Sequence, residues 1–480
     1  MCTLDERPLF SLSPSHPFPL TSPSPGSVLP SSEFPQNASD RLPLLFQPLE
    51  IKSMEFKNRI FLAPMCQYSA AIEGDDAGVA NDWHKAHWMS FATRGAALVI
   101  TEATSVSPEG RLSPQDLGLW NDKQCDALKP IFASLKASGA RVGIQLCHAG
   151  RKSSTLPPWL SLHPADSNVA TSAYGGWPDK VVGPSATPYH SETYPHPKEM
   201  TKAEIRELQE DWVSAVKRAD EAGADVLELH FAHGYLIHNF LSPVSNKRTD
   251  EYGGSLESRL RLPLSLISLT RAVWPANKPL FLRISATDWH PAGEKNEQGE
   301  WISWGVEQSK ILVHEAIKRG IDLVDVSSGG NDPEQQIKPG PLYQVPFASD
   351  IRKSIHADFA SSVASTHASA NSTSVGGAGE YPTLVSAVGL ITSAEQAEGV
   401  LQQGKADVVT IGRAFLRDPS LVFNWAQDLG VAVSVPVQYQ RAFTRMLKKR
   451  VPRDDQQCHL EQDGNVEVGD SKKMGEEVKK

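Results

Sequence analysis

The 480-residue sequence lacks several patterns that would define a function at once. None of the five cysteines belongs to a Cys-x-x-Cys pair, which disfavours an iron–sulfur cluster, a zinc ribbon and a disulfide scaffold. The Gly-x-Gly-x-x-Gly turn of dinucleotide-binding folds is also missing. No apolar run approaches the ~18 to 20 residues of a membrane span, and no secretory or transit signal opens the chain. These absences predict a cytoplasmic protein that does not enter membranes.

A basic excess is missing as well. The formal net charge is −9 and the pI is about 5.9, so no broad positive surface is expected to neutralise nucleic-acid phosphates. The hydrophobic content of 40% is enough for an ordinary globular core. We therefore expect neither nucleic acid nor membrane as a partner.

Three segments are too polar, or too rich in Ser and Pro, to bury a core. Residues 1–40 are predicted to form a disordered Ser/Pro-rich tail, and residues 451–480 a disordered polar tail. The low-complexity stretch 360–380 is predicted to be a surface-loop insertion. Residues 41–450 remain as one folded domain.

Within this domain, short apolar and β-branched runs alternate with segments of helical periodicity. Capping signals mark the helices; Thr201 with Glu204 begins one, and Gly223 ends it. Strands that are apolar on both faces and alternate with helices predict a parallel sheet covered by helices. A count of eight favours a (β/α)8 TIM barrel over a doubly wound open sheet. The expected strands are 59–65, 96–104, 141–149, 224–232, 280–288, 321–329, 384–391 and 406–414.

Polar side chains gather at the predicted carboxyl ends of these strands, where a barrel places its chemistry. Few of them are carboxylates, which argues against glycoside hydrolysis and a two-metal hydrolase. Gly389 and Gly412 end the last two strands, where backbone N–H groups can approach a phosphate, and Arg413 adds a bidentate partner. Gln145 and Arg283 would meet the other end of a flat polar ligand, although a satisfied interior amide and a core ion pair explain them equally well.

The stretch ELHFAHGYLIHNFL (228–241) combines three histidines with a tyrosine. His230 and His233 follow a strand end, and two imidazole N–H groups there would polarise a carbonyl oxygen, with Tyr235 as proton donor. His238 falls in a helical segment and is expected to be structural. Glu228 should point the same way as His230, deeper in the barrel. A zinc-dependent hydrolase that uses His230 and His233 is the alternative, but the HExxH pattern is missing.

Seven motifs in order resemble the old yellow enzyme family of FMN-dependent ene-reductases, in its bacterial-type (thermophilic-like) NADPH dehydrogenase branch. The resemblance runs from about Phe46 to Phe443. The motifs are FKNRIFLAPMCQYS (56–69), EATSVSPEGRLSPQDLGLW (102–120), GIQLCHAGRK (143–152), HFAHGYLIHNFLSPVSNKRTDEYGGS (230–255), LRISATD (282–288), IGRAFLRDP (411–419) and VPVQYQRAF (435–443).

The resemblance implies bound FMN. Gln145 and Arg283 would bond the pyrimidine edge of the flavin, with Arg283 favouring negative charge near N1 and O2. Cys66 would tune the flavin potential. Gly389, Gly412 and Arg413 would hold the phosphate. The residues expected to line the flavin are Ala63, Pro64, Met65, Cys66 and Ala103.

The resemblance also implies the roles around the substrate. His230 and His233 would grip the carbonyl oxygen, Tyr235 would protonate Cα, and Tyr68 would contact the substrate. Arg441 resembles the arginine that this branch inserts into a neighbouring subunit's site, so a homodimer or homotetramer is expected.

The implied reaction is a ping-pong reduction of the C=C bond of an α,β-unsaturated carbonyl compound. NAD(P)H passes a hydride to N5 of FMN and leaves, and N5 then passes the hydride to Cβ of the enone. The nicotinamide uses the face of the flavin, which explains why no Rossmann glycines are needed. Segments 153–199, 288–304 and 356–380 depart from the family pattern.

Overall fold

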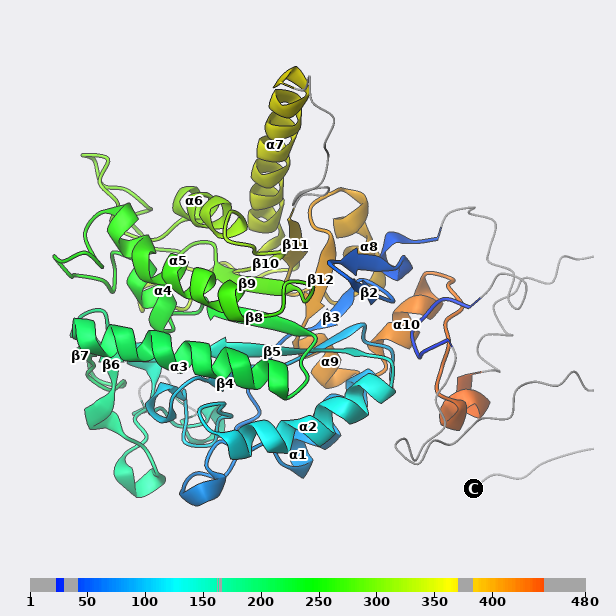
Figure 1. The fold of residues 1–480 in the computed structure, drawn as a ribbon, viewed down its shortest axis with the longest axis horizontal. Helices are drawn as coiled ribbons and strands as arrows, with labels where there is room; N and C mark the ends of the chain where they lie inside the picture. The colour runs from blue at the N-terminus through cyan, green and yellow to red at the C-terminus, as the bar shows by residue number, and fades with distance from the viewer. Residues whose placement is uncertain (1–22, 30–41, 162, 164–165, 370–382, 444–480) are drawn as a thin grey trace, which may run out of the picture.

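The computed structural model describes residues 23–29, 42–161, 163, 166–369 and 383–443. Eight parallel strands close into a barrel in the order β10-β11-β12-β3-β4-β5-β8-β9 (Figure 1). This confirms the predicted TIM barrel, and each expected strand overlaps one observed strand. The barrel strands are β3 (Ile60–Leu62), β4 (Leu98–Ser105), β5 (Arg141–Cys147), β8 (Val226–Phe231), β9 (Leu280–Ser285), β10 (Leu323–Ser327), β11 (Leu384–Ala387) and β12 (Val408–Ile411).

Helices surround the barrel, as expected for strands that are buried on both faces (Figure 1). The predicted capping box of Thr201 and Glu204 is present at the start of α3. Gly223, which was predicted to end this helix, has a φ of 89°, in the left-handed region that glycine adopts without strain. The helices are α1 (Asp82–Ala92), α2 (Asp122–Ala137), α3 (Lys202–Glu221), α4 (Leu236–Leu241), α5 (Leu256–Val273), α6 (Val306–Ile317), α7 (Val345–Ser369), α8 (Ala394–Gln402), α9 (Arg413–Arg417) and α10 (Leu421–Asp428).

An antiparallel hairpin, β1 (Leu49–Ile51) and β2 (Met54–Phe56), covers the amino-terminal end of the barrel. Its apolar side chains join a buried cluster with residues from the first halves of the strands, among them Phe61 and Phe281. The rings of Phe56 and Phe61 lie 5.1 Å apart. Because this end is filled with apolar side chains, the polar chemistry is confined to the opposite end.

Two predictions about the segments outside the barrel need correction. Residues 23–29 do not belong to a disordered tail: Val28 forms a β-bridge with Val433, and Gly26 N donates to Ser434 O at 2.8 Å. The predicted loop insertion is helical as far as Ser369, because α7 continues without a break through an alanine-rich stretch and stands away from the barrel (Figure 1). The rest of the two predicted tails and residues 370–382 lie outside the described residues.

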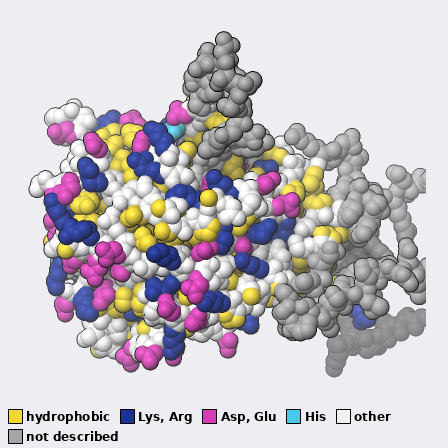
Figure 2. Space-filling model, viewed as in Figure 1, with side chains coloured by type: hydrophobic (Ala, Val, Ile, Leu, Met, Phe, Trp, Pro, Cys, Tyr) yellow, Lys and Arg dark blue, Asp and Glu magenta, His cyan; other side chains and the backbone are white. Residues whose placement is uncertain are grey.

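Basic and acidic side chains are intermixed over the face shown in Figure 2, without a broad area of one sign. Across the described residues, no helix combines the length and apolarity needed to cross a membrane.

Candidate active site

The predicted site residues arrive from different strands and meet at the carboxyl end of the barrel. Strand register sets their neighbours: Ala103 lies opposite Gln145, Gln145 opposite Glu228, and His230 opposite Arg283. Side chains of adjacent strands at the same level point to the same side of a sheet. The register therefore brings residues that are far apart in sequence into one polar layer.

The loop after β3 carries Cys66 and Tyr68. Cys66 packs against a small buried cluster that contains Ala103 and Tyr235. Burial raises the pKa of the Cys66 thiol, and the nearby carboxyls of Asp116 and Glu102 raise it further. Cys66 is therefore a thiol rather than a thiolate at neutral pH.

A buried carboxyl fixes this loop. Glu102 accepts a hydrogen bond from Gln67 N at 3.3 Å and lies 3.3 Å from Nε2 of the buried His84. Tyr68, next in the chain, has a φ of 51°, which is uncommon for a residue with a side chain. The loop thus holds one constrained backbone position beside Cys66.

Gln145 and Glu228 form a hydrogen bond inside the barrel. Gln145 Nε2 donates to Glu228 Oε1 at 2.7 Å, which leaves the amide oxygen of Gln145 as an acceptor. Burial, with the charge of Asp325 nearby, raises the pKa of Glu228 to about 8. Glu228 is the deeper residue that the alternation along β8 predicts, and it is protonated at neutral pH.

Arg283 lies on the neighbouring strand β9, opposite His230 and therefore one layer nearer the carboxyl end than Glu228. Its Nε is 3.2 Å from Oδ2 of the buried Asp325. Its terminal nitrogens make no hydrogen bond to the described residues, and the side chain is 6% exposed. A buried guanidinium with unused donors is suited to bind a ligand oxygen or nitrogen.

His230 and His233 lie next to each other, with ring centroids 5.0 Å apart and Nε2 of His230 3.4 Å from Nδ1 of His233. His230 Nδ1 accepts a hydrogen bond from Ala232 N, so its proton is on Nε2. His233 Nε2 is 2.8 Å from Ser327 Oγ. Burial, together with the charge of Arg283, holds the pKa of both imidazoles well below the ordinary value. Both rings are neutral N–H donors at neutral pH.

Tyr235 lies beside this pair, with its ring centroid 4.8 Å from that of His230. Burial raises the pKa of Tyr235 well above its ordinary value, and the neighbouring Cys66 and Tyr68 raise it further. The phenol is therefore protonated and able to donate a proton. His238, expected to be structural, is buried in α4 with Nε2 3.1 Å from Asp288 Oδ1.

Two basic residues of η4 (Gly150–Lys152) tie three loops together, and the sequence reasoning missed both. Lys152 Nζ donates to His233 O at 3.0 Å and to Gly330 O. Arg151 donates to the backbone and side-chain oxygens of Asn331. The loops after β5, β8 and β10 are thus cross-linked around His233. The GRK motif in the sequence was visible, but its partners lie 81 and 178 residues further along the chain.

The glycines predicted to hold a phosphate differ in their surroundings. A Cβ on Gly412 would make only ordinary contacts, at 3.5 Å to Met65 Sδ and 3.7 Å to Ala63 Cβ. Gly412 precedes α9 without a side-chain cap, so the first N–H groups of this helix are free to meet an anion. Arg413 is exposed and forms no ion pair with the described residues. This end of the site therefore fits a phosphate.

Gly389 has a φ of 115°, and a Cβ there would lie 2.6 Å from Gln344 Nε2. Gln344 donates to Val388 O at 3.0 Å and accepts from Ser328 Oγ at 2.6 Å. It also accepts from Ser327 Oγ at 3.3 Å, which connects the phosphate end to His233. No local sequence signal marks Gln344, because its role depends on three loops meeting.

Together, the hydrogen-bonding groups of the site fit the FMN that the family resemblance implies. Gln145 offers an acceptor for an imide N–H, and Arg283 offers donors for the adjacent oxygen and nitrogen. Gly412 and Arg413 offer donors at the opposite end, where a phosphate would lie. Ala63, Pro64 and Met65 lie between these ends, directly after β3.

Arg441 is not brought to the site of its own chain. Its neighbours Tyr439 and Phe443 contact Arg94 and Phe423 instead, at 5.2 Å and 5.1 Å from the respective ring centroids. Arg441 itself is exposed.

In the part of the chain that the structure describes, no third His, Cys, Asp or Glu lies close enough to His230 and His233 to complete the alternative zinc site. Among the described residues, the one group of three candidate ligands within 4.8 Å is Cys125, Asp126 and Glu221, on the outer helices. Lys129 already pairs with both of these carboxylates at 2.8 Å.

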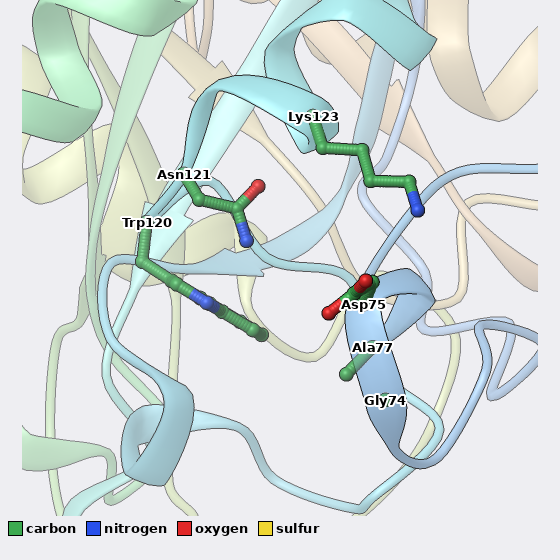
Figure 3. A pocket seen from close by; sticks show the side chains of 6 residues that line it. All are labelled: Gly74, Asp75, Ala77, Trp120, Asn121 and Lys123. Atoms are coloured by element: carbon green, nitrogen blue, oxygen red, sulfur yellow. The ribbon is translucent and has the colours of Figure 1, made fainter.

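A cavity of about 360 Å³ lies outside the predicted site (Figure 3). Lys123, on its wall, is ion-paired with Asp76 at 2.8 Å. None of the predicted site residues takes part in it. The lining residues are Gly74, Asp75, Ala77, Trp120, Asn121 and Lys123.

Comparisons with known proteins show which family this chain resembles. A model of the NADH:flavin oxidoreductase / NADH oxidase family matches residues 44–431. An NADH:flavin oxidoreductase of Gibberella zeae is 45% identical over 403 residues, which cover 83% of this chain and 89% of that protein. An NADPH dehydrogenase of a Geobacillus species is 39% identical over 400 residues, which cover 83% and 98%. The solved structure of morphinone reductase is similar with a TM-score of 0.59 at 25% identity, covering 83% of this chain and 93% of that one.

Proposed function

The chain belongs to the NADH:flavin oxidoreductase / NADH oxidase family, the old yellow enzyme family, and we propose that it reduces the C=C bond of α,β-unsaturated carbonyl compounds. Membership makes it an oxidoreductase with FMN as cofactor and NAD(P)H as hydride donor. When bound, FMN supplies the hydride chemistry: it takes a hydride from NAD(P)H and gives one to the β-carbon of the substrate.

One observation carries the proposal for C=C reduction: the rings of His230 and His233 lie 5.0 Å apart, and the phenol ring of Tyr235 lies 4.8 Å from that of His230. His230 and His233 would donate N–H bonds to the carbonyl oxygen, where negative charge develops as a hydride reaches the β-carbon. Tyr235 would give its phenolic proton to the α-carbon and recover it from water. Hydride and proton together saturate the double bond.

The remaining predicted residues would position the cofactor and the substrate. Gln145 and Arg283 would hold the pyrimidine edge of FMN, and Arg283 would offset negative charge there. Gly389, Gly412 and Arg413 would hold its phosphate. Ala63, Pro64, Met65, Cys66 and Ala103 would line the ring system, with Tyr68 reaching the substrate.

We also propose a homodimer or homotetramer in which Arg441 reaches the site of a neighbouring copy. Its exposed side chain, beside a segment that packs on Arg94 and Phe423, supports this arrangement. Loss of activity in Arg441→Ala, restored by mixing with a variant that lacks Tyr235 but keeps Arg441, would test the sharing of sites.

The central experiment follows the flavin directly. Purified protein should absorb near ~450 nm, bleach when NADPH is added and recover when cyclohexenone follows. Bleaching without recovery by any enone would show flavin reduction but overturn the proposal for C=C reduction. A protein that never binds FMN would overturn the site as a whole.

A further inference from the structure

Tyr68 and Trp159 come from different loops and meet at the rim of the barrel mouth. Their ring centroids lie 5.5 Å apart at an interplanar angle of 89°, an edge-to-face contact. Tyr68 is only partly buried, whereas Trp159 is 54% exposed and its neighbour Leu160 is 51% exposed. A large apolar surface is therefore open to solvent directly above a predicted substrate contact.

The turn that carries Trp159 is held in place. Trp159 lies in η5 (Pro158–Leu160), after two consecutive prolines that restrict the backbone. Leu160 N donates to Pro157 O at 2.9 Å, and Leu156 N donates to Asn168 O at 2.7 Å. The exposed indole is thus presented by a fixed backbone.

Tyr68 also lies near other tyrosines, among them the predicted proton donor Tyr235. Burial raises the pKa of Tyr68, and nearby groups that include Cys66 and Tyr194 raise it further; Tyr68 in turn adds to the raised pKa of Tyr235. Tyr194 contacts Tyr189 with ring centroids 4.8 Å apart. We call Tyr68, Trp159, Tyr189 and Tyr194 the aromatic rim.

We propose that the aromatic rim selects enones whose carbonyl is attached to a large, flat, mostly apolar ring system of several fused rings. This inference rests on the proposed C=C reduction. With the carbonyl oxygen at His230 and His233, the remainder of such a substrate extends past Tyr68 to the indole of Trp159. Aromatic faces and edges favour flat apolar partners, while the tyrosine hydroxyls tolerate scattered polar groups.

We expect a small enone such as cyclohexenone, bound by its carbonyl at the histidine pair, to make little contact with Trp159. The rim should therefore affect large and small substrates differently. Loss of one aromatic contact is expected to weaken binding about 2- to 10-fold. This difference separates a selecting role from a structural one.

The test compares Trp159→Ala, Trp159→Phe and the control Tyr174→Ala. Tyr174 belongs to the same segment, 153–199, is 57% exposed and has no ring contact with Tyr68. Each FMN-loaded protein is assayed with cyclohexenone and with a tetracyclic 4-en-3-one. Calorimetry with the saturated tetracyclic ketone gives affinity without turnover.

We expect Trp159→Ala to lower kcat/KM for the tetracyclic enone about 5- to 10-fold and its affinity for the saturated ketone similarly, with less than ~2-fold change for cyclohexenone. Trp159→Phe should retain most of the preference, and Tyr174→Ala all of it. Equal losses on both substrates, or no loss on the large one, would overturn the inference. If the saturated ketone binds in a Trp159-dependent way but no enone is reduced, the proposed selection by the aromatic rim is supported and the proposed C=C reduction is contradicted.

Discussion

The ammonium group of Lys152 lies 3.0 Å from the backbone oxygen of His233 and also bonds the oxygen of Gly330. His233 has a φ of 61°, in the left-handed region, and a Cβ on Gly330 would lie 2.7 Å from the His233 backbone. Two loops are therefore interlocked at van der Waals distance, and one partly buried cation bonds both of them. No carboxylate pairs with this cation among the described residues; burial lowers the pKa of Lys152 to about 7, and neighbouring Arg151 adds to this effect.

Lys152→Met should lower both stability and turnover. The substitution leaves two partly buried carbonyls without this donor, at a cost of about 1 kcal/mol in the free energy of unfolding. His233 then loses its backbone support, and we expect kcat to fall about 10-fold, because a displaced donor stabilises the oxygen poorly.

The matched control is Lys57→Met, at the closed end of the barrel. Lys57 is also buried, with a pKa lowered to about 7 by burial, and it donates to Gly139 O at 2.9 Å. This control should lose stability and keep kcat. Equal kcat values for Lys152→Met and Lys57→Met would contradict the positioning role of Lys152. Urea unfolding and steady-state kinetics measure the two quantities.

Replacement of both His230 and His233 by Ala should abolish most enone reduction while FMN stays bound. Removal of preorganised donors to a developing oxyanion typically costs about 100- to 1000-fold in kcat. The flavin spectrum and its rate of bleaching by NADPH should change much less. His314→Ala, on the outer helix α6, is the control. Turnover at the wild-type rate in the double variant would rule out the proposed role of the two histidines as donors to the carbonyl oxygen.

Glu228→Gln should make the protein comparatively more stable as pH rises. Because the pKa of Glu228 is raised to about 8, the folded chain keeps a proton that the unfolded chain releases above ~4.3. The wild-type free energy of unfolding therefore falls between about pH 4.3 and pH 8, by up to ~1.4 kcal/mol per pH unit. Glutamine carries no such proton and keeps the acceptor for Gln145.

Urea unfolding at pH 5, 6.5 and 8 measures this difference. As pH rises, the free energy of unfolding of Glu228→Gln should increase steadily relative to that of the wild type. For Glu297→Gln, at an exposed position, the difference from the wild type should not change with pH. A difference that is also independent of pH for Glu228→Gln would mean that the Glu228 carboxyl is ionised in the folded protein.

Gly412→Ala and Gly389→Ala should separate cofactor binding from folding. At Gly412 the added methyl group meets only ordinary contacts, so the stability of the FMN-free protein should change by less than ~0.5 kcal/mol. FMN affinity should still fall at least ~10-fold, because the methyl group keeps a phosphate from the helix N–H groups. Gly389→Ala should also destabilise the FMN-free protein, by about 1 to 3 kcal/mol, because its φ is 115°. Flavin fluorescence titration and thermal unfolding provide both readouts; unchanged FMN affinity in Gly412→Ala would rule out this phosphate site.

The barrel was predictable because its signals are local. Each strand is a short apolar run, and capping residues such as Thr201 mark where helices begin. The placement of His230 and Arg283 in one layer followed from counting strands, since parallel register brings the strand ends together.

Contacts between distant loops were not predictable in the same way. Gln344 bridges Ser328 and Val388 only because α7 begins between two strand ends. Lys152 meets His233 through backbone oxygens, which carry no residue-specific signal. The Ser/Pro composition around residues 23–29 argued for disorder, but pairing with Ala432 and Ser434 at the far end of the chain orders them. Composition cannot reveal a partner that is 400 residues away.

The β1–β2 hairpin covers the amino-terminal end of the barrel with apolar side chains, so the reacting groups face the opposite, carboxyl end. In the proposed ping-pong reaction, NAD(P)H and the enone would occupy that end of the barrel in turn. A large excess of one would then slow the binding of the other. Inhibition by excess NAD(P)H or excess enone is therefore an expected consequence of this architecture.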